Sequence, residues 1–223
     1  LIHLHVKNSM FKKLLNLIFL SFKGYSLLRS YQLNECKNIK LKGYSIEFGA
    51  YKDKRKNFNN FFKGNSKFTF SNIYRKKDKN YIKLDLTKKL KLKKDTFDNI
   101  IIMNVLEHLP DLSIVFKEID RILKKKGNLI GSTPFIYQIH GAPFDYHRFT
   151  KDFFYKVFSK KKYKSLVIKS LGFGPFTASY GLIQTYLRFF PILREILLII
   201  CYLIDAFIQI FVNTRLKEIY PIG

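Results

Sequence analysis

The stretch from Thr96 to Thr150 concentrates side chains that can move a proton. Three of its histidines, His108, His140 and His147, fall within forty residues of one another. An imidazole has an unperturbed pKa of about 6.5, so it can accept a proton near neutral pH. A hydroxyl group that gives its proton to such a base becomes a nucleophile, and this is the chemistry that the clustering indicates.

His140 is the candidate base, because it follows Pro134 in a loop that we expect to cross a cleft. Asp145 can orient that imidazole or hold a hydroxyl group of the molecule to be modified. Arg148 can bind a carboxylate or phosphate of that molecule through two parallel hydrogen bonds. A second interpretation stays open, in which Asp145 and Arg148 form a salt bridge that fixes the loop and Tyr146 packs against it.

Alternating strands and helices must position these residues. Apolar or alternating runs predict strands over 43–49, 67–73, 81–86, 97–104, 128–133 and 163–171. Helical spacing and capping residues predict helices over 10–35, 57–63, 111–123 and 151–158. Asp111 and Thr150 are the expected caps, and Gly127 is expected to close the third helix region. The alternation predicts an α/β fold with a mostly parallel sheet flanked by helices.

Three motifs follow one another along this stretch: FDNIIIMNVLEH at 97–108, RILKKKGN at 121–128 and PFIYQIHGAPFDYHRFT at 134–150. Their order resembles class I S-adenosylmethionine (SAM)-dependent methyltransferases of the type 11-like group, with the pattern FD-x-VLEH followed by P-x-H-x-x-P-x-D-Y-x-R-x-T. The resemblance covers roughly residues 41–174. It implies a Rossmann-like fold, SAM as the cofactor, and methyl transfer.

The resemblance also implies which residues hold SAM. The family's first turn reads E-x-G-x-G-x-G, of which this chain keeps Glu47 and Gly49. Asn72 stands at the second strand end, where the family has an acid that accepts the ribose hydroxyls. Asp85 matches the acid near the adenine amine, and Asn104 matches the strand end beside the methionine part. These five residues are the expected cofactor-binding set.

Two glycines of the family's first turn are missing, because Tyr51 and Asp53 stand in their places. The first interpretation is an active SAM-dependent methyltransferase for a small hydroxylated acceptor, of the kind linked to bacterial surface-glycan or lipid-linked sugar metabolism. The alternative is a methyltransferase-like module that has lost catalysis and serves in binding or at a membrane. Asn72 supports this alternative together with the two missing glycines.

Metal ligands are too few in the sequence to predict a metal site. Some relatives bind a divalent metal through E-x-x-E-H, whereas this chain has Asn104 in place of the first glutamate before Glu107 and His108. Two ligands do not make a site, so no metal is expected. Cys36 and Cys201 lie far apart, which leaves no disulfide framework or cysteine-based metal site.

The net charge of +25 raises the question of a nucleic-acid partner. Of the 41 basic residues, 33 are lysines and 8 are arginines, whereas specific readout of phosphate and guanine depends on arginine. The lysine and asparagine bias is typical of an AT-rich genome. We therefore assign the charge first to a general attraction to anionic surfaces, including anionic lipids. A nucleic-acid methyltransferase or binder stays open as a third, less favoured interpretation.

The ends of the chain suggest a three-part division. Residues 1–40 form a leader with an amphipathic helix, 41–180 the SAM-binding domain, and 181–223 a hydrophobic helical tail that we expect to be truncated. The run 181–212 is almost continuously apolar. It can span a membrane, lie on one as a helical hairpin, or cap its own sheet. These features predict a cytoplasmic protein with peripheral contact to the inner face of the membrane through 181–212, and they predict no particular oligomeric state.

Overall fold

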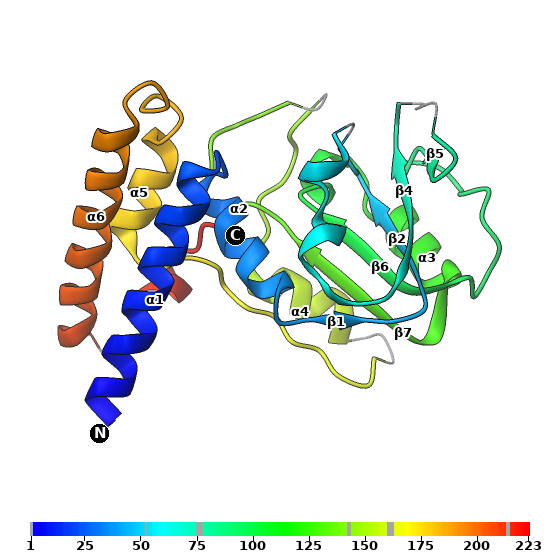
Figure 1. The fold of residues 1–223 in the computed structure, drawn as a ribbon. Coiled ribbons are helices and arrows are strands. Elements are labelled where there is room, and N and C mark those ends of the chain that lie inside the picture. Colours follow the sequence, from blue (N-terminus) through cyan, green and yellow to red (C-terminus); the bar gives the residue numbers. More distant parts are fainter. Residues whose placement is uncertain (1, 52, 75–77, 142–143, 160–162, 213–214) are drawn as a thin grey trace. The chain divides into compact units, whose positions relative to one another are not determined.

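The computed structural model describes residues 2–51, 53–74, 78–141, 144–159, 163–212 and 215–223 (Figure 1). The chain forms two compact units. The sheet unit comprises Leu33–Thr133 and Ile139–Phe149, and the helical unit comprises Leu1–Gln32, Pro134–Gln138 and Thr150–Gly223. The division into 1–40, 41–180 and 181–223 stays a prediction.

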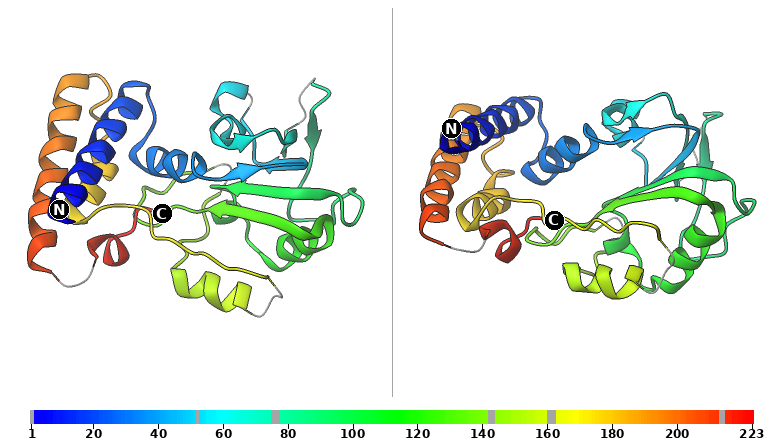
Figure 2. Two further views of the ribbon diagram at one scale, coloured as in Figure 1. Left: turned by 60° about the horizontal axis from the view of Figure 1, so that its bottom comes forward. Right: turned by 90° about the horizontal axis from the view of Figure 1, so that it is seen from below.

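The sheet unit is built on five strands: β2 (Tyr44–Phe48), β4 (Lys67–Asn72), β5 (Tyr81–Lys83), β6 (Phe97–Met103) and β7 (Leu123–Ser132). Their order is β5-β4-β2-β6-β7, and each neighbouring pair is parallel (Figure 2). A separate pair joins β1 (Lys40–Leu41) to β3 (Lys63–Gly64). The predicted α/β fold with a parallel sheet is confirmed.

Burial explains the central strand and the helix that follows it. Ile100, Ile101 and Ile102 of β6 are at most 2% exposed, as expected for a strand covered on both faces. The helix α3 (Ser113–Ile122) packs against β7. Asp111 accepts hydrogen bonds from the backbone N–H and the hydroxyl of Ser113, both at 2.8 Å, in the turn before α3. The predicted cap at Asp111 is wrong, because the N-cap position is Leu112, which makes no side-chain capping bond.

One predicted helix boundary in the sheet unit is wrong, and one predicted short helix is a 3-10 helix. Gly127 lies inside β7 and does not end a helix, because the strand already begins at Leu123, which pairs with Phe97 of β6. Tertiary pairing outweighs the helical pattern of the lysine-rich run here. The helix predicted over 57–63 is a short 3-10 turn, η2 (Phe58–Phe61), preceded by η1 (Lys54–Lys56).

The strand order reverses between β2 and β6. From β2 the chain moves outward to β4 and β5, and then returns to place β6 and β7 on the other side of β2. In open parallel sheets, ligands bind beyond the carboxyl ends of the strands at such a switch point. The residues that follow β2 and β6 therefore define the candidate site.

The helical unit contains α1 (Ile2–Phe22), the first part of α2 (Leu27–Cys36), α4 (Lys151–Ser159), α5 (Pro175–Ile183), α6 (Pro191–Phe211) and α7 (Leu216–Ile219). The single helix predicted over 10–35 is thus two helices. α6 packs against both α1 and α5 (Figure 1). Leu17, Tyr180 and Cys201 belong to their shared core. Thr150 caps α4 as predicted, since its hydroxyl accepts the N–H of Phe153 at 3.3 Å.

Two buried acids of α6 join the helices. The carboxylate of Asp205 accepts the backbone N–H groups of Phe176 (3.0 Å) and Thr177 (2.8 Å), at the start of α5. A Cβ on Gly174 would lie 2.5 Å from the Asp205 carboxyl carbon, so this approach requires glycine. Glu195 accepts the hydroxyl of Ser21 on α1 at 2.7 Å. The polar interruptions of the tail therefore have structural roles.

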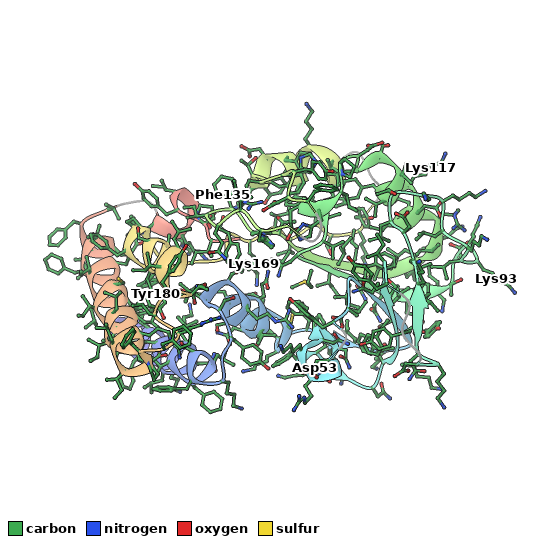
Figure 3. The ribbon with its side chains drawn as sticks, turned by 90° about the horizontal axis from the view of Figure 1, so that it is seen from above. Asp53, Lys93, Lys117, Phe135, Lys169 and Tyr180 are labelled. Atoms are coloured by element: carbon green, nitrogen blue, oxygen red, sulfur yellow. The ribbon has the colours of Figure 1, made fainter. Side chains whose placement is uncertain are left out.

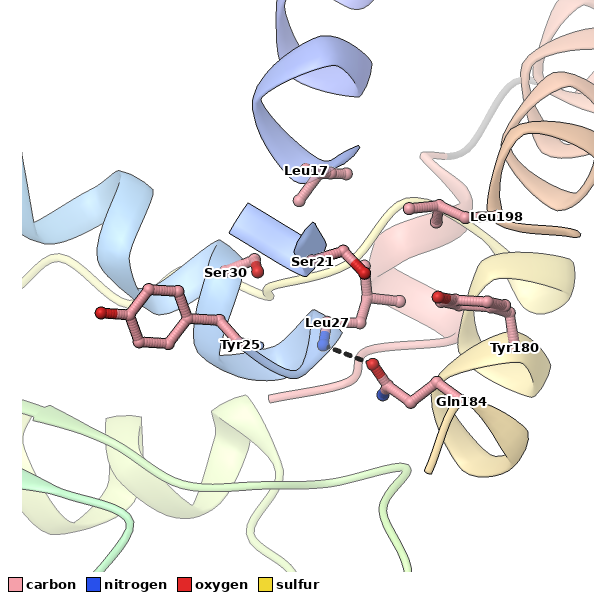
Figure 4. Close-up of a pocket in the computed structure, with 8 residues that line it drawn as sticks. All are labelled: Leu17, Ser21, Tyr25, Leu27, Ser30, Tyr180, Gln184 and Leu198. Atoms are coloured by element: carbon pink, nitrogen blue, oxygen red, sulfur yellow. Dashed lines mark hydrogen bonds between the residues drawn. The ribbon is translucent and has the colours of Figure 1, made fainter. Parts of the chain in front are cut away.

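A narrow pocket with an empty volume of about 150 Å³ lies among these helices and is lined by Leu17, Ser21, Tyr180 and Gln184, among others (Figure 4). The N–H of Leu27 donates to Oε1 of Gln184 at 2.8 Å. Almost none of this space has room for a water molecule, so the pocket is too small for a nucleoside cofactor.

The strand predicted over 163–171 is wrong, because these residues form no regular structure. The N–H of Leu171 donates to the carbonyl of Gly223 at 2.7 Å, and its carbonyl accepts the N–H of Ile222 at 2.8 Å. The end of the segment thus takes its backbone partners from the end of the chain. Within the described residues, none of the helices combines the length and the apolar character that crossing a membrane requires.

Candidate active site

The turn after β2 depends on Gly49. Its φ of +69° lies in the left-handed region that favours glycine. A Cβ at this position would lie 2.4 Å from Cγ2 of Val105, which follows β6 in the chain. Glycine therefore lets the two segments approach each other at the switch point. A bare backbone of this kind is what the resemblance implies for contact with SAM.

Glu47 holds the loop that follows this turn through hydrogen bonds. Its side chain is buried at the end of β2, and its two carboxylate oxygens accept the N–H groups of Phe58 (2.9 Å) and Asn59 (3.0 Å). These are N–H groups of the first turn of η2, where a carboxylate is favourable. Glu47 thus positions the loop, and both of its oxygens are already used by the fold.

Asn72 fastens the same turn from β4. Its Nδ2 donates to the carbonyl of Ala50 at 2.8 Å, and its Oδ1 accepts the N–H of Tyr74 at 3.1 Å. An ionised aspartate could make the second bond but not the first, because it has no donor. The structure therefore gives a local reason for asparagine where the family has an acid.

Asp85 and Asn104 lie just beyond the carboxyl ends of β5 and β6. Hydrogen bonds from the hydroxyl (2.6 Å) and N–H (3.0 Å) of Thr87 lower the pKa of Asp85, so its carboxylate is ionised. Asn104 has a φ of +54°, a conformation that asparagine tolerates better than most residues, and its N–H donates to the carbonyl of Ser132 at 2.7 Å. Both positions can present polar groups to a ligand at the sheet edge.

The residues that replace the family's later glycines are held by their surroundings. The N–H of Tyr51 donates to Oδ1 of Asn57, and its carbonyl accepts the hydroxyl of Tyr81, both at 2.7 Å. The ring of Tyr51 is about half exposed. Asp53 pairs with the exposed guanidinium of Arg55. The turn is thus stabilised by side-chain contacts that the glycine-rich pattern does not contain.

His140, Asp145 and Arg148 form one hydrogen-bonded group. Asp145 accepts the backbone N–H of His140 at 2.9 Å, and the same oxygen lies 3.3 Å from His140 Nδ1. Arg148 donates to both oxygens of Asp145, with Nη2 at 2.7 Å from Oδ2. The Arg148 guanidinium holds the pKa of Asp145 well below its usual range. The salt bridge of the second interpretation is therefore present, and the same ionised carboxylate contacts the candidate base.

His108 joins this group from the 3-10 turn η3 (Leu106–His108), which follows β6. Its Nδ1 lies 2.6 Å from the carbonyl of Phe144, and because a carbonyl only accepts, Nδ1 carries the proton. The N–H of Tyr146 donates to the carbonyl of Glu107 at 2.7 Å. The rings of His108 and His140 meet edge to face with their centroids 5.0 Å apart. Pro143 of the loop motif lies outside the described residues.

Glu107, His108 and His140 could together hold a metal ion. Each offers one ligand atom, and these atoms lie within 4.8 Å of one another. The Nδ1 of each histidine faces a protein oxygen, an arrangement that supports histidine ligands in metal sites. The count of two ligands from the sequence is therefore incomplete, because His140 comes from a distant loop. The clustering of three histidines in the sequence was the signal that could have predicted His140 as a third ligand.

Glu107 is the most unusual acid of the site. It is fully buried, and neither carboxylate oxygen has a hydrogen-bond partner among the described residues. Burial raises the pKa of Glu107 to about 8, so the side chain is a neutral acid at neutral pH. Nε2 of His147 is also buried without a partner within the described part of the chain. Neither of these unpartnered groups could be predicted from the sequence.

The expected cofactor residues fall into two groups. Gly49, Asp85 and Asn104 fit SAM, since they provide a close backbone approach, an ionised carboxylate and a polar strand end. Glu47 and Asn72 are committed to backbone contacts, so they would shape the cradle without binding the ligand.

Residues 63–131 match the family model described as a methyltransferase domain. The match runs from β3 to within β7 and includes the strand ends at Asn72, Asp85 and Asn104. Among curated protein sequences, none matches this chain.

Several solved structures are similar to this chain at low sequence identity. A chain from the complex between the Haloferax volcanii Trm112 methyltransferase activator and a protein described as a methyltransferase is 12% identical, with a TM-score of 0.49, covering 66% of this chain and 76% of that one. A protein described as a sarcosine dimethylglycine methyltransferase from Galdieria sulphuraria is 14% identical, with a TM-score of 0.48 and coverage of 80% and 81%. Coclaurine N-methyltransferase, bound to N-methylheliamine and SAH, is 13% identical, with a TM-score of 0.47 and coverage of 85% and 69%.

The parallel sheet, its switch point and the family match support a class I methyltransferase. The family match indicates an enzyme that depends on SAM, with SAM as its cofactor.

Proposed function

We propose that this chain transfers a methyl group from SAM to a hydroxyl group of a small acceptor, with His140 as the base. The supporting observation is the contact between His140 and the ionised Asp145 next to the switch point. Val105 touches the Gly49 turn, and η3 follows it directly and carries His108, whose ring meets that of His140. The candidate base and the candidate cofactor turn thus belong to one connected edge of the sheet unit.

The residues of the chain can perform the proton transfer in a simple way. SAM, when bound, supplies an electrophilic methyl group attached to a positively charged sulfur. In the proposed tautomer His140 carries its proton on Nδ1, which lies 3.3 Å from Oδ2 of Asp145, so its Nε2 has the lone pair that takes the hydroxyl proton of the acceptor. The acceptor oxygen would use the freed electron pair to form the new bond to the methyl carbon, while the carbon–sulfur bond breaks and its electron pair stays on sulfur, which leaves the neutral demethylated cofactor. Asp145 then stabilises the resulting imidazolium, and Arg148 keeps Asp145 ionised.

A neutral imidazole suits a hydroxyl acceptor. The resemblance links such acceptors to surface-glycan or lipid-linked sugar metabolism, so we propose a small hydroxylated molecule of that kind, in the cytoplasm. Arg148 was expected to grip a carboxylate or phosphate of the acceptor. Its guanidinium is engaged with Asp145, so we propose that it acts as a positioning residue.

The second candidate function is a methyltransferase-like binding module without catalysis. It is favoured by Asn72 and Glu47, whose side chains are tied to the backbone, and by Asp53, which pairs with Arg55. Binding of SAM without turnover in the native chain would favour this module.

Isothermal titration of the full chain with SAM and its demethylated product tests the proposal. Gly49→Ala should abolish measurable binding, because the new Cβ would clash with Val105 in addition to the strain of a positive φ. Gly24→Ala is the matched control. Gly24 has a φ of +82°, but nothing lies within 4 Å of its Cβ position. It should leave the affinity unchanged. No heat from the native chain at millimolar SAM would refute the proposal.

His140→Gln separates binding from chemistry. It should keep the affinity for SAM within a factor of about two and lower product formation by about 10²–10⁴-fold, the usual contribution of a general base. Product formation is measured as release of demethylated cofactor with a mixture of monosaccharides and sugar phosphates as acceptors. An unchanged rate would show that His140 is not the base.

A further inference from the structure

Two helices of the helical unit expose large apolar side chains to solvent. On α1, Phe11, Leu15, Phe19 and Phe22 are each at least 50% exposed. On α6 the exposed residues recur at helical spacing, between 47% and 75% exposed: Ile196, Ile200, Leu203, Phe207 and Ile210. Side chains project from α6 on the side away from α5 (Figure 3).

These side chains are not needed for the core of the unit. Each helix already buries a separate apolar face, through Leu14 and Leu17 on α1 and through Leu198 and Cys201 on α6. A surface helix of a globular protein normally has one apolar face, and a large second one marks an interaction surface.

The charges around these faces have one sign. The sequence of α1 contains no aspartate or glutamate, and the acids of α6, Glu195 and Asp205, are buried. Lys12 and Lys13 of α1 are exposed. Every exposed charge on the described residues of α1, α5 and α6 is therefore basic. A surface that combines apolar and basic side chains without acids is complementary to anionic lipid.

Basic and aromatic side chains are also paired at one end of the two helices. Nζ of Lys23 lies 4.3 Å from the ring centroid of Phe19, and the guanidinium of Arg188 lies 4.5 Å from that of Phe189. The bond between Ser21 and Glu195 places these pairs at the same end of α1 and α6. Such pairs suit the boundary between headgroups and acyl chains, where aromatic rings are buried and cations stay in water.

We propose that α1 and α6 form a docking surface for an anionic lipid bilayer. The exposed side chains of both helices enter the acyl boundary, and the lysines and Arg188 contact the headgroups. Both helices lie along the membrane surface. A protein partner is less suited to this face, because lysine is depleted in protein interfaces. This inference goes beyond methyl transfer and does not depend on it.

Sedimentation with vesicles tests the docking surface on the full chain. The probes are vesicles of equal parts phosphatidylcholine and phosphatidylglycerol, and vesicles of phosphatidylcholine alone. The triple variant Ile196→Gln, Leu203→Gln and Phe207→Gln should bind the anionic vesicles at least about tenfold more weakly, since it removes three inserted side chains. The matched control replaces three exposed apolar residues elsewhere: Tyr74→Gln, Val167→Gln and Ile219→Gln. It should bind like the native chain.

A charge variant tests the second part of the surface. Lys12→Gln, Lys13→Gln and Lys23→Gln should weaken binding to the anionic vesicles by about 10–100-fold and leave binding to the neutral vesicles unchanged. Circular dichroism checks that each variant is folded. The proposal is overturned if the folded native chain stays in the supernatant with anionic vesicles at low salt. It is also overturned if light scattering shows a dimer that the apolar triple variant abolishes, because a second copy then covers the face. SAM titration of the same samples reports on the cofactor site separately.

Discussion

Replacing Glu107 by glutamine should change how the stability of the protein depends on pH. Glu107 is fully buried, and its carboxyl oxygens have no hydrogen-bond partner among the described residues. Burial raises its pKa from 4.5 to about 8. Between these values the folded chain holds a proton that the unfolded chain releases. The proton on Glu107 therefore contributes fully to the free energy of unfolding below the pKa of the unfolded chain. This contribution is lost as the pH rises through about 8.

The size of the effect follows from the pKa shift. One pKa unit corresponds to about 1.4 kcal/mol, so a shift from 4.5 to about 8 corresponds to about 5 kcal/mol in the free energy of unfolding. Glutamine has nearly the same shape and does not ionise. The stability difference between Glu107→Gln and the native chain should be small at about pH 5 and should reach about 5 kcal/mol in favour of the variant at about pH 9.

Urea unfolding followed by circular dichroism at these two pH values measures the difference. Glu118→Gln is the control, because Glu118 is also buried but is paired with Arg121, whose hydrogen bonds lower the pKa of Glu118. The stabilisation by the ionised Glu118 is lost only in acid. The Glu118→Gln variant should therefore be less stable than the native chain by the same amount at both pH values. If the stability difference between Glu107→Gln and the native chain is the same at both pH values within about 1 kcal/mol, burial does not keep this acid neutral.

Three further substitutions test other contacts. Asn72→Asp removes the donor to Ala50 and should lower stability in urea by about 1–3 kcal/mol without improving SAM affinity by calorimetry, and tighter SAM binding would contradict this. Arg148→Met removes both guanidinium hydrogen bonds from Asp145, which keeps the N–H of His140, and should cost about 1.5–3 kcal/mol in the same assay, whereas a loss near zero would deny the salt bridge any role. Asp205→Ala should cost about 1–2 kcal/mol and speed hydrogen exchange at the start of α5, and unchanged exchange there would argue against capping.

Much of the sheet could be predicted because buried strands leave a local signal. The apolar run of β6 needs no knowledge of its neighbours to be recognised. The start of β7 could not be predicted, since Leu123 becomes extended only by pairing with Phe97. The segment 163–171 shows the opposite error. It has strand-like composition, yet Val167 is exposed, and an alternating pattern does not reveal whether a sheet edge is within reach.

The sequence indicated which residues of the candidate site lie together, but not the hydrogen bonds that most of them make. The sequence indicated that Asp145 and Arg148 act together, and the structure shows the pair. It did not indicate that Asn72 holds the carbonyl of Ala50, or that Asp205 caps a helix. Such roles depend on backbone groups brought close by the fold, and backbone groups leave no trace in residue identity.

One buried acid of the described residues differs from the others in its bonding. Most of them are bonded to backbone N–H groups or to arginine: Glu47, Glu118, Glu195 and Asp205. Among the buried acids of the described residues, Glu107 differs in that neither oxygen is bonded. A buried polar group without partners destabilises the fold, so its presence calls for a use outside folding. Glu107 offers an oxygen within 4.8 Å of ligand atoms on His108 and His140, which makes the junction of η3 and the His140 loop the place to look for the acceptor.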